Sequence, residues 1–166
     1  MPGVSSDADL TVRAARLLRN ESGRKDGVTI HLTKRLPLGG GLGGGSSDAA
    51  TTLMALNRLW QCGLSSIELQ RLGLSLGADV PVFIHGRACF AEGVGDQFTD
   101  LALPAAWYLV TIPGVSVPTA EIFRAPDLRR NTPAMASAAW RPGIGGNDLE
   151  PVARRLFPEV GRHLDW

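Results

Sequence analysis

The sequence predicts a mixed fold of helices and strands in one or two small domains, on three observations. Its 166 residues are 44% hydrophobic and 20% charged, which suits a globular chain that buries about two-thirds of its unfolded surface. Apolar residues recur at helical spacing in some segments and alternate with polar residues in others. Glycines number 20, about twice the usual ~7%, and six of them fall within residues 39–45.

Helical segments are marked by apolar residues at helical spacing, preceded by a residue that can cap the first turn. In residues 46–61, Ala49, Leu53, Leu56 and Trp60 follow the spacing i, i+4, i+7, i+11 of one helix face. We predict further helices at residues 7–20, 65–76, 119–124 and 147–157. Side-chain oxygens accept the free N–H groups of a first turn, so the expected caps in chain order are Asp7 or Asp9, Ser46 or Ser47, Ser65 or Ser66, Thr119, and Asn147 or Asp148.

Three other segments are predicted as strands. Residues 28–35 alternate between apolar and polar side chains, and Pro37 ends the pattern because proline has no N–H for a ladder. Residues 82–92 are interpreted as a strand or a bent hairpin, and residues 107–112 as a strand. The pattern restarts near Leu103, which is therefore the expected domain boundary.

Charge, hydropathy and cysteine content exclude several classes of protein. Seventeen basic and sixteen acidic residues leave a net charge of +1, which provides neither a basic footprint for nucleic acid nor a polybasic membrane anchor. No apolar run approaches the ~20 residues of a membrane-spanning helix, and the first ten residues lack the pattern of a signal peptide. Cys62 and Cys89 fit no CxxC pattern, and the three histidines lack metal-ligand spacing. We expect a cytoplasmic protein that binds neither nucleic acid nor membrane.

A glycine loop joins the first predicted strand to the helix that begins near Ser46. Its sequence with the flanking residues 36–50 is LPLGGGLGGGSSDAA. Glycine lets backbone N–H groups approach a ligand closely, and a helix start presents free N–H donors at the positive end of its dipole. The unit therefore predicts an anion site suited to a polyphosphate, with the hydroxyls of Ser46 and Ser47 able to reach a phosphate or its Mg²⁺.

Other interpretations of this loop fit less well. A flexible linker would not normally lie between a patterned strand and a capped amphipathic helix. A Walker A loop needs a lysine after its last glycine, but Ser46 follows Gly45. The dinucleotide pattern GxGxxG matches at Gly39, Gly41 and Gly44, yet the acidic residue expected about 20 positions later, at the end of a second parallel strand, is missing. The glycine loop of protein kinases joins two strands, whereas this loop begins a helix.

The loop resembles the phosphate-binding motif of the GHMP kinases, the superfamily named for galactokinase, homoserine kinase, mevalonate kinase and phosphomevalonate kinase. The resemblance runs from about Asp7 to the C-terminus. It implies an α+β, two-domain GHMP-kinase-like fold, with residues 1–103 as an N-terminal ATP-binding domain that lacks its first strands and residues 104–166 as part of a C-terminal domain. Further segments that resemble one member of the superfamily are KRLP at 34–37, NRLW at 57–60, LGADVPVF at 76–83, AEGVG at 91–95 and PGVSVPT at 113–119.

The resemblance also implies roles for particular residues. Asp79 would be the catalytic aspartate, although its own sequence context favours a turn-capping residue. Thr119 and Phe123 would face the cytosine of the substrate, while from the sequence alone Phe123 could equally be a core aromatic. Lys34, on sequence alone a solvated lysine, would lie beside the nucleotide, and Asp9 stands where the family usually has Asn. The ATP-binding residues would be Lys34, Pro37, Leu38, Gly39, Gly40, Gly41, Leu42, Gly43, Gly44, Gly45, Ser46 and Ser47.

The function implied by the resemblance is the phosphorylation of a small molecule with ATP and Mg²⁺. The substrate would be 4-diphosphocytidyl-2-C-methyl-D-erythritol, phosphorylated at its 2-hydroxyl in non-mevalonate isoprenoid precursor biosynthesis. The family's N-terminal strand with Pro-Ala-Lys-Leu-Asn and its closing glycine motif are not found. We therefore expect a fold incomplete at both termini, with weak nucleotide binding, low thermal stability and negligible turnover. A non-catalytic nucleotide-binding module and, more distantly, a dehydrogenase stay open as alternatives, and the sequence does not predict an oligomeric state.

Overall fold

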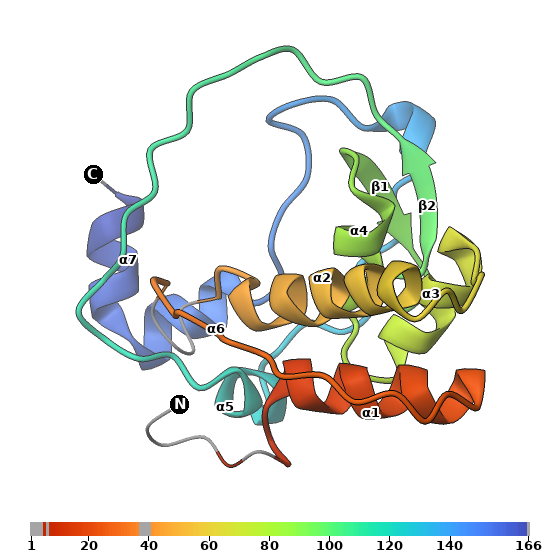
Figure 1. Cartoon of the computed structure of the whole chain (residues 1–166). Coiled ribbons are helices and arrows are strands. Elements are labelled where there is room, and N and C mark those ends of the chain that lie inside the picture. The colour runs from red at the N-terminus through yellow and green to blue at the C-terminus, as the bar shows by residue number, and fades with distance from the viewer. Residues whose placement is uncertain (1–4, 6, 37–40, 166) are drawn as a thin grey trace. The chain divides into compact units, whose positions relative to one another are not determined.

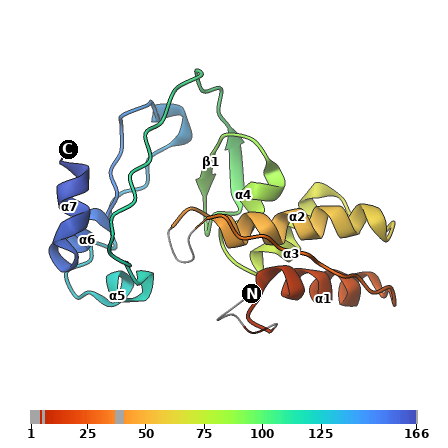
Figure 2. The same ribbon diagram turned by 60° about the vertical axis from the view of Figure 1, so that its left-hand side comes forward.

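The computed structural model describes residues 5, 7–36 and 41–165 of the chain, and these fall into two compact units. The first unit ends at Pro104 and the second begins at Ala105. Figures 1 and 2 show the elements of each unit, which are described here separately. None of the helices in the described ranges is long and apolar enough to cross a membrane.

The first unit is built on two helices that lie side by side, α1 (Leu10–Ser22) and α2 (Gly44–Leu59) (Figure 1). The carboxylate of Asp9 caps α1 by accepting the N–H of Thr11 at 2.8 Å, so Asp9 rather than Asp7 is the cap. The predicted apolar face of α2 is confirmed, because all four of its residues are buried. The core of this unit consists of Ala14, Ala15, Leu18, Ala49, Ala50, Leu53, Leu56, Trp60, Leu69, Leu72, Val80 and Ile84.

Two shorter helices, α3 (Ser66–Leu74) and α4 (Val80–His85), complete this core. Ser65 and Glu68 form a capping box at the start of α3, as a serine followed three residues later by a glutamate favours. The antiparallel hairpin of β1 (Cys89–Glu92) and β2 (Gln97–Asp100) follows α4, and its register pairs Cys89 with Asp100.

The strand prediction for residues 82–92 was wrong in its first half. Residues 82–85 belong to α4, because Pro81 fits the first helical turn and places Val80 and Ile84 on one buried face. Gly86 ends the helix in the left-handed conformation, with φ of 70°. Of the predicted segment only residues 89–92 form a strand, and the partner of that strand, β2, lies outside residues 82–92, so no hairpin forms within the segment.

Residues 28–35 form no strand either, although they keep the burial pattern of one. Ile30, Leu32 and Lys34 are half-buried while the residues between them are exposed. A strand requires hydrogen bonds to a neighbouring chain segment, and no such ladder forms beside residues 28–35 in the described part of the chain. The predicted alternation is therefore confirmed for Ile30 and Leu32 but not for Val28, which is exposed, and the hydrogen-bonded strand is absent.

The second unit has a smaller core formed by Ile122, Ala125, Leu128 and Val152. Its elements are α5 (Thr119–Arg124), the 3₁₀ turn η1 (Ser137–Ala139), α6 (Glu150–Leu156) and α7 (Pro158–Leu164). The helix predicted at 119–124 is confirmed. The helix predicted at 147–157 begins three residues later than expected and is followed by α7, which was not predicted.

The strand predicted at residues 107–112 is absent. The segment is exposed along its length, with Trp107 fully accessible. It pairs with no other segment among the described residues. The segment therefore forms no β-ladder, although its residues favour β-structure.

A candidate phosphate-binding site at the start of helix α2

Helix α2 begins inside the glycine loop, two residues earlier than predicted. Gly43 precedes it in the left-handed conformation, with φ of 67°, and provides no side-chain cap. The expected cap by Ser46 or Ser47 is therefore wrong, because both serines already lie within the helix. The part of the loop formed by Pro37, Leu38, Gly39 and Gly40 lies outside the described residues.

The first turn of α2 presents backbone donors with no acceptor in the helix. Its first helical hydrogen bond runs from Ser47 N to the carbonyl of Gly43, at 2.9 Å. The N–H groups of Gly44, Gly45 and Ser46 come before this bond, so the helix offers them no acceptor. Three N–H groups at the positive end of a sixteen-residue helix can bind an anion such as a phosphate.

An ion pair lies beside this turn. The Nζ of Lys34 is 2.6 Å from the Oδ2 of Asp48, and the two side chains are 19% and 29% exposed. The same Nζ is 3.4 Å from the point that a Cβ on Gly44 would occupy. Lys34 is thus a half-buried, paired cation next to the first helical residue, not a freely solvated lysine. Asp48 neutralises part of the positive charge at this end of α2.

The loop glycines are in close contact with side chains of the same unit. A Cβ on Gly43 would lie 2.7 Å from the Cζ of Phe83, below any normal carbon–carbon contact. A Cβ on Gly44 would lie 3.3 Å from the Cδ1 of Leu36, and one on Gly45 would lie 3.4 Å from the Cδ1 of Leu10. Close packing within the protein therefore requires glycine at position 43 in particular.

Asp79 precedes the first residue of α4 and is exposed. Its side chain makes no capping hydrogen bond to that helix, so the turn-capping interpretation from the sequence does not describe it. Val80 already belongs to α4, although the residue before a proline is usually extended. Phe83, one helical turn further along α4, is the residue that contacts Gly43. The structure thus places Asp79 on a helix that packs against the start of α2.

Thr119 and Phe123 both lie on α5 in the second unit. Phe123 is 52% exposed, and its neighbour Ile122 occupies the core instead. The interpretation of Phe123 as a core aromatic is therefore wrong. The exposed ring is free to contact a ligand, and Thr119 is also exposed at the start of the helix.

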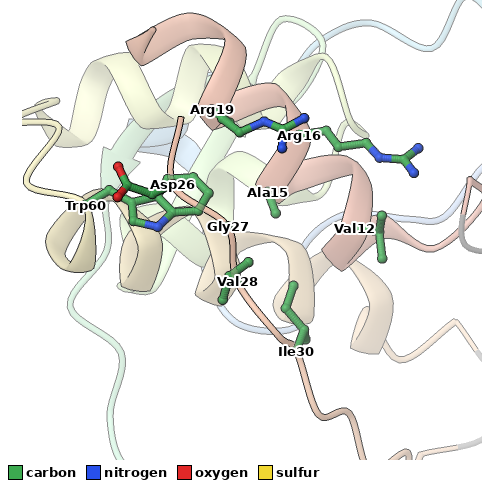
Figure 3. Close-up of a pocket in the computed structure, with 9 residues that line it drawn as sticks. All are labelled: Val12, Ala15, Arg16, Arg19, Asp26, Gly27, Val28, Ile30 and Trp60. Atoms are coloured by element: carbon green, nitrogen blue, oxygen red, sulfur yellow. The ribbon is translucent and has the colours of Figure 1, made fainter. Parts of the chain in front are cut away.

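The first unit also has a hollow of about 420 Å³ between α1 and residues 26–30 (Figure 3). Asp26 and Trp60 appear on the same side of it in this view, and Val28 and Ile30 follow the chain along it. It is lined by Val12, Ala15, Arg16, Arg19, Asp26, Gly27, Val28, Ile30 and Trp60. Of the predicted site residues that the structure describes, none lines this hollow.

Asp48 and Phe83 are the two residues at the candidate site that the sequence analysis did not assign to it. Asp48 occurs there only in the sequence that flanks the loop, and Phe83 only in the segment LGADVPVF at 76–83. The alternation of residues 30, 32 and 34 toward one side was a signal that Lys34 points inward. No local pattern links Gly43 to Phe83, since forty positions separate them.

Comparison with known proteins identifies the class first. Residues 9–87, which include the loop, Lys34, α2 and Asp79, match the family described as "GHMP kinases N terminal domain". This match agrees with the resemblance of the loop motif to the GHMP kinases, and the α+β fold of the chain is the one expected of that family.

More specific similarity is to one kind of kinase within this family. The chain is 60% identical over 166 residues to the 4-diphosphocytidyl-2-C-methyl-D-erythritol kinase of Dechloromonas aromatica, covering 100% of this chain and 61% of the relative. It is 61% identical to the enzyme of the same name from Thiobacillus denitrificans, covering 60% of that relative. A crystal structure of 4-(cytidine 5'-diphospho)-2C-methyl-D-erythritol kinase matches with a TM-score of 0.73 and 38% identity, over 98% of this chain and 62% of that one. The chain spans about 60% of the length of these relatives.

Proposed function

We propose that this chain carries the ATP-phosphate site and the catalytic aspartate of a small-molecule kinase. The reaction would transfer the γ-phosphoryl group of ATP to the 2-hydroxyl of 4-diphosphocytidyl-2-C-methyl-D-erythritol. The observation that carries the proposal is the start of α2, where three N–H groups without helical acceptors follow Gly43 and lie beside the ammonium of Lys34. High identity to kinases of that name supports the choice of substrate.

In this proposal each element of the first unit has a separate task. The glycine loop and the N–H groups of Gly44, Gly45 and Ser46 hold the phosphates, and Lys34 adds a positive charge that favours the polyphosphate. Asp79, exposed at the start of α4, accepts the proton of the attacking hydroxyl or orients that hydroxyl toward the phosphorus. Residues 1–103 would form the ATP-binding domain.

The oxygen ligands at the start of α2 also fit a magnesium ion. Ser46, Ser47 and Asp48 are consecutive in the first turns of the helix, and Mg²⁺ is usually held by one or two carboxylates together with the phosphates of its substrate. When bound there, the ion would neutralise charge on the phosphates. The hydroxyls of Ser46 and Ser47 and the carboxylate of Asp48 are the groups that would hold it.

The second unit would contribute to the site for the diphosphocytidyl substrate. Phe123 presents an exposed aromatic ring on which a cytosine can stack, and Thr119 offers a hydroxyl for a hydrogen bond. Residues 104–166 would form part of the second domain of the kinase. A cytoplasmic location, with no role for nucleic acid, is in keeping with the small net charge and the two free cysteines.

A chimaeric enzyme tests this function directly. The 166 residues replace the matching segment of the 60% identical kinase of Dechloromonas aromatica, and turnover of ATP and the diphosphocytidyl substrate is measured in a coupled assay. We expect turnover in the range of about 1–100 per second that is typical of kinases. A folded chimaera that binds ATP but does not phosphorylate the substrate would support a non-catalytic nucleotide-binding module instead.

A further inference from the structure

Phe83 makes an unusual contact for a residue of a core helix. Its ring lies against the backbone of Gly43, where even a Cβ would come within 2.7 Å of Cζ and 3.0 Å of Cε2. Val80, Pro81 and Ile84 of α4 are buried, whereas Val82 and Phe83 are half-buried. The ring of Phe83 packs against the core of this unit with one part and covers Gly43, the last loop residue before α2, with its tip.

Helix α4 makes an equally close contact with α3. Gly73 on α3 faces Val80 and Ile84, and a Cβ on Gly73 would lie 2.8 Å from Val80 Cγ1 and 2.9 Å from Ile84 Cδ1. Helix α4 therefore packs against one glycine on α3 and against another in the phosphate loop. A short helix held at two close contacts has little freedom to shift relative to either, because packed interiors do not deform smoothly.

We infer that Phe83 is a positioning residue that fixes the turn at Gly43 and ties it to the helix that Asp79 precedes. The left-handed conformation of Gly43 sets the direction of the three N–H groups that follow it, and the ring prevents this turn from rotating away. The inference rests on the proposed function, since it concerns the geometry of the same phosphate site. It predicts that altering Phe83 weakens the binding of a polyphosphate more than the binding of a nucleotide with one phosphate.

Gly41 provides a matched control for Gly43. Both glycines have φ of 67°, so an alanine at either position is strained to a similar degree. A Cβ on Gly41 meets no atom of the described residues within 4 Å, whereas a Cβ on Gly43 meets the ring of Phe83. The difference between Gly43→Ala and Gly41→Ala therefore isolates the contact with the ring.

The experiment measures the dissociation constants of ATP and AMP by titration calorimetry for the whole chain and its variants. We expect Phe83→Leu and Phe83→Ala to weaken the binding of ATP by about tenfold or more, which is the loss expected for one misaligned hydrogen bond to a charged group. The affinity for AMP should change by less than about threefold. Phe90→Leu, which alters a half-buried aromatic on β1, should leave the ATP-to-AMP ratio unchanged. Thermal melting identifies which variants remain folded, and Phe83→Leu retains most of the side-chain volume.

The two glycine variants complete the test. Gly43→Ala should weaken the binding of ATP more than Gly41→Ala does. In the double variant Gly43→Ala/Phe83→Ala this additional loss of affinity should disappear, because the ring no longer contacts the new methyl group. If the wild-type chain does not bind ATP more tightly than AMP, the proposed function fails and the inference fails with it. If the wild-type chain prefers ATP but folded Phe83→Leu keeps the same ratio, or the two glycine variants behave alike in both backgrounds, the inference alone is overturned.

Discussion

Replacing Gly73 by alanine should separate α4 from α3 and destabilise the first unit. The new Cβ would lie 2.8 Å from Val80 Cγ1 and 2.9 Å from Ile84 Cδ1, about 1 Å closer than the preferred separation of carbon atoms. Val80 is fully buried and Ile84 is 7% exposed, so neither can move toward solvent without opening the core. Inserting a methyl group into a packed core costs typically 1–3 kcal/mol.

The higher helix propensity of alanine offsets part of this cost, but the gain is smaller than the cost. Alanine is favoured over glycine by about 1 kcal/mol in a helix interior, and Gly73 is next to the last residue of α3, where the advantage is reduced. We therefore expect a net loss of about 1–2 kcal/mol in the free energy of unfolding. The assay is urea denaturation followed by circular dichroism, with an unchanged m-value as evidence that only stability has changed.

Gly77→Ala is the matched control for this prediction. A Cβ there would lie 3.8 Å from Val80 Cγ2, an ordinary van der Waals contact, so its free energy of unfolding should stay within about 0.5 kcal/mol of the wild type. Val80→Ala should recover part of the loss in the Gly73→Ala background, because it removes the methyl group that the new Cβ meets. A Gly73→Ala variant as stable as the wild type would refute the close contact between α3 and α4.

Three further predictions concern charged residues. In the chimaeric kinase Asp79→Asn should lower turnover by about 10²–10⁴-fold with little change in ATP affinity, and near-normal turnover would mean that Asp79 handles no proton. Hydrogen bonds from Thr11 lower the pKa of Asp9, so its capping contribution of about 1 kcal/mol is present above pH 4 and is lost as the pH falls through the lowered value. Asp9→Ala should therefore destabilise the chain more at pH 7 than at a pH below the lowered pKa, while Asp9→Asn, whose amide oxygen still accepts the N–H of Thr11, should lose less at pH 7 than Asp9→Ala; equal losses for both variants by urea denaturation would contradict this. Without Mg²⁺ and at low salt, Asp48→Asn should strengthen triphosphate binding about fivefold by freeing Lys34, and weaker binding by calorimetry would instead make Asp48 part of the binding surface.

Features determined by neighbouring residues were predicted well from the sequence. Ser65 is the cap of α3, one of the two serines expected there, and the capping box that it forms with Glu68 is local because its donors and acceptors lie within four residues. The buried face of α2 follows from spacing alone, since Leu53 and Leu56 stand on one side of any helix formed there. The glycine loop was likewise placed directly before a helix start.

Features that depend on distant partners were not predictable in the same way. Residues 28–35 and 107–112 have strand-like composition, but a ladder needs a second segment that no local pattern supplies. Residues 82–85 are a short apolar run whose periodicity does not separate strand from helix. The ion pair of Lys34 with Asp48 and the contact of Phe83 with Gly43 join residues that come together only in the folded chain.

The central claim, that the start of α2 binds the phosphates of a nucleotide, is tested most directly by backbone amide NMR. A ¹⁵N-labelled sample of the chain is titrated with ATP, with AMP and with inorganic triphosphate, and the chemical-shift change of each amide is recorded. We expect ATP and triphosphate to cause the largest changes at the amides of Gly44, Gly45 and Ser46, and AMP to cause smaller changes there. Saturable ATP binding that leaves these three amides unchanged and instead shifts the residues around the hollow between α1 and residues 26–30 would contradict the account.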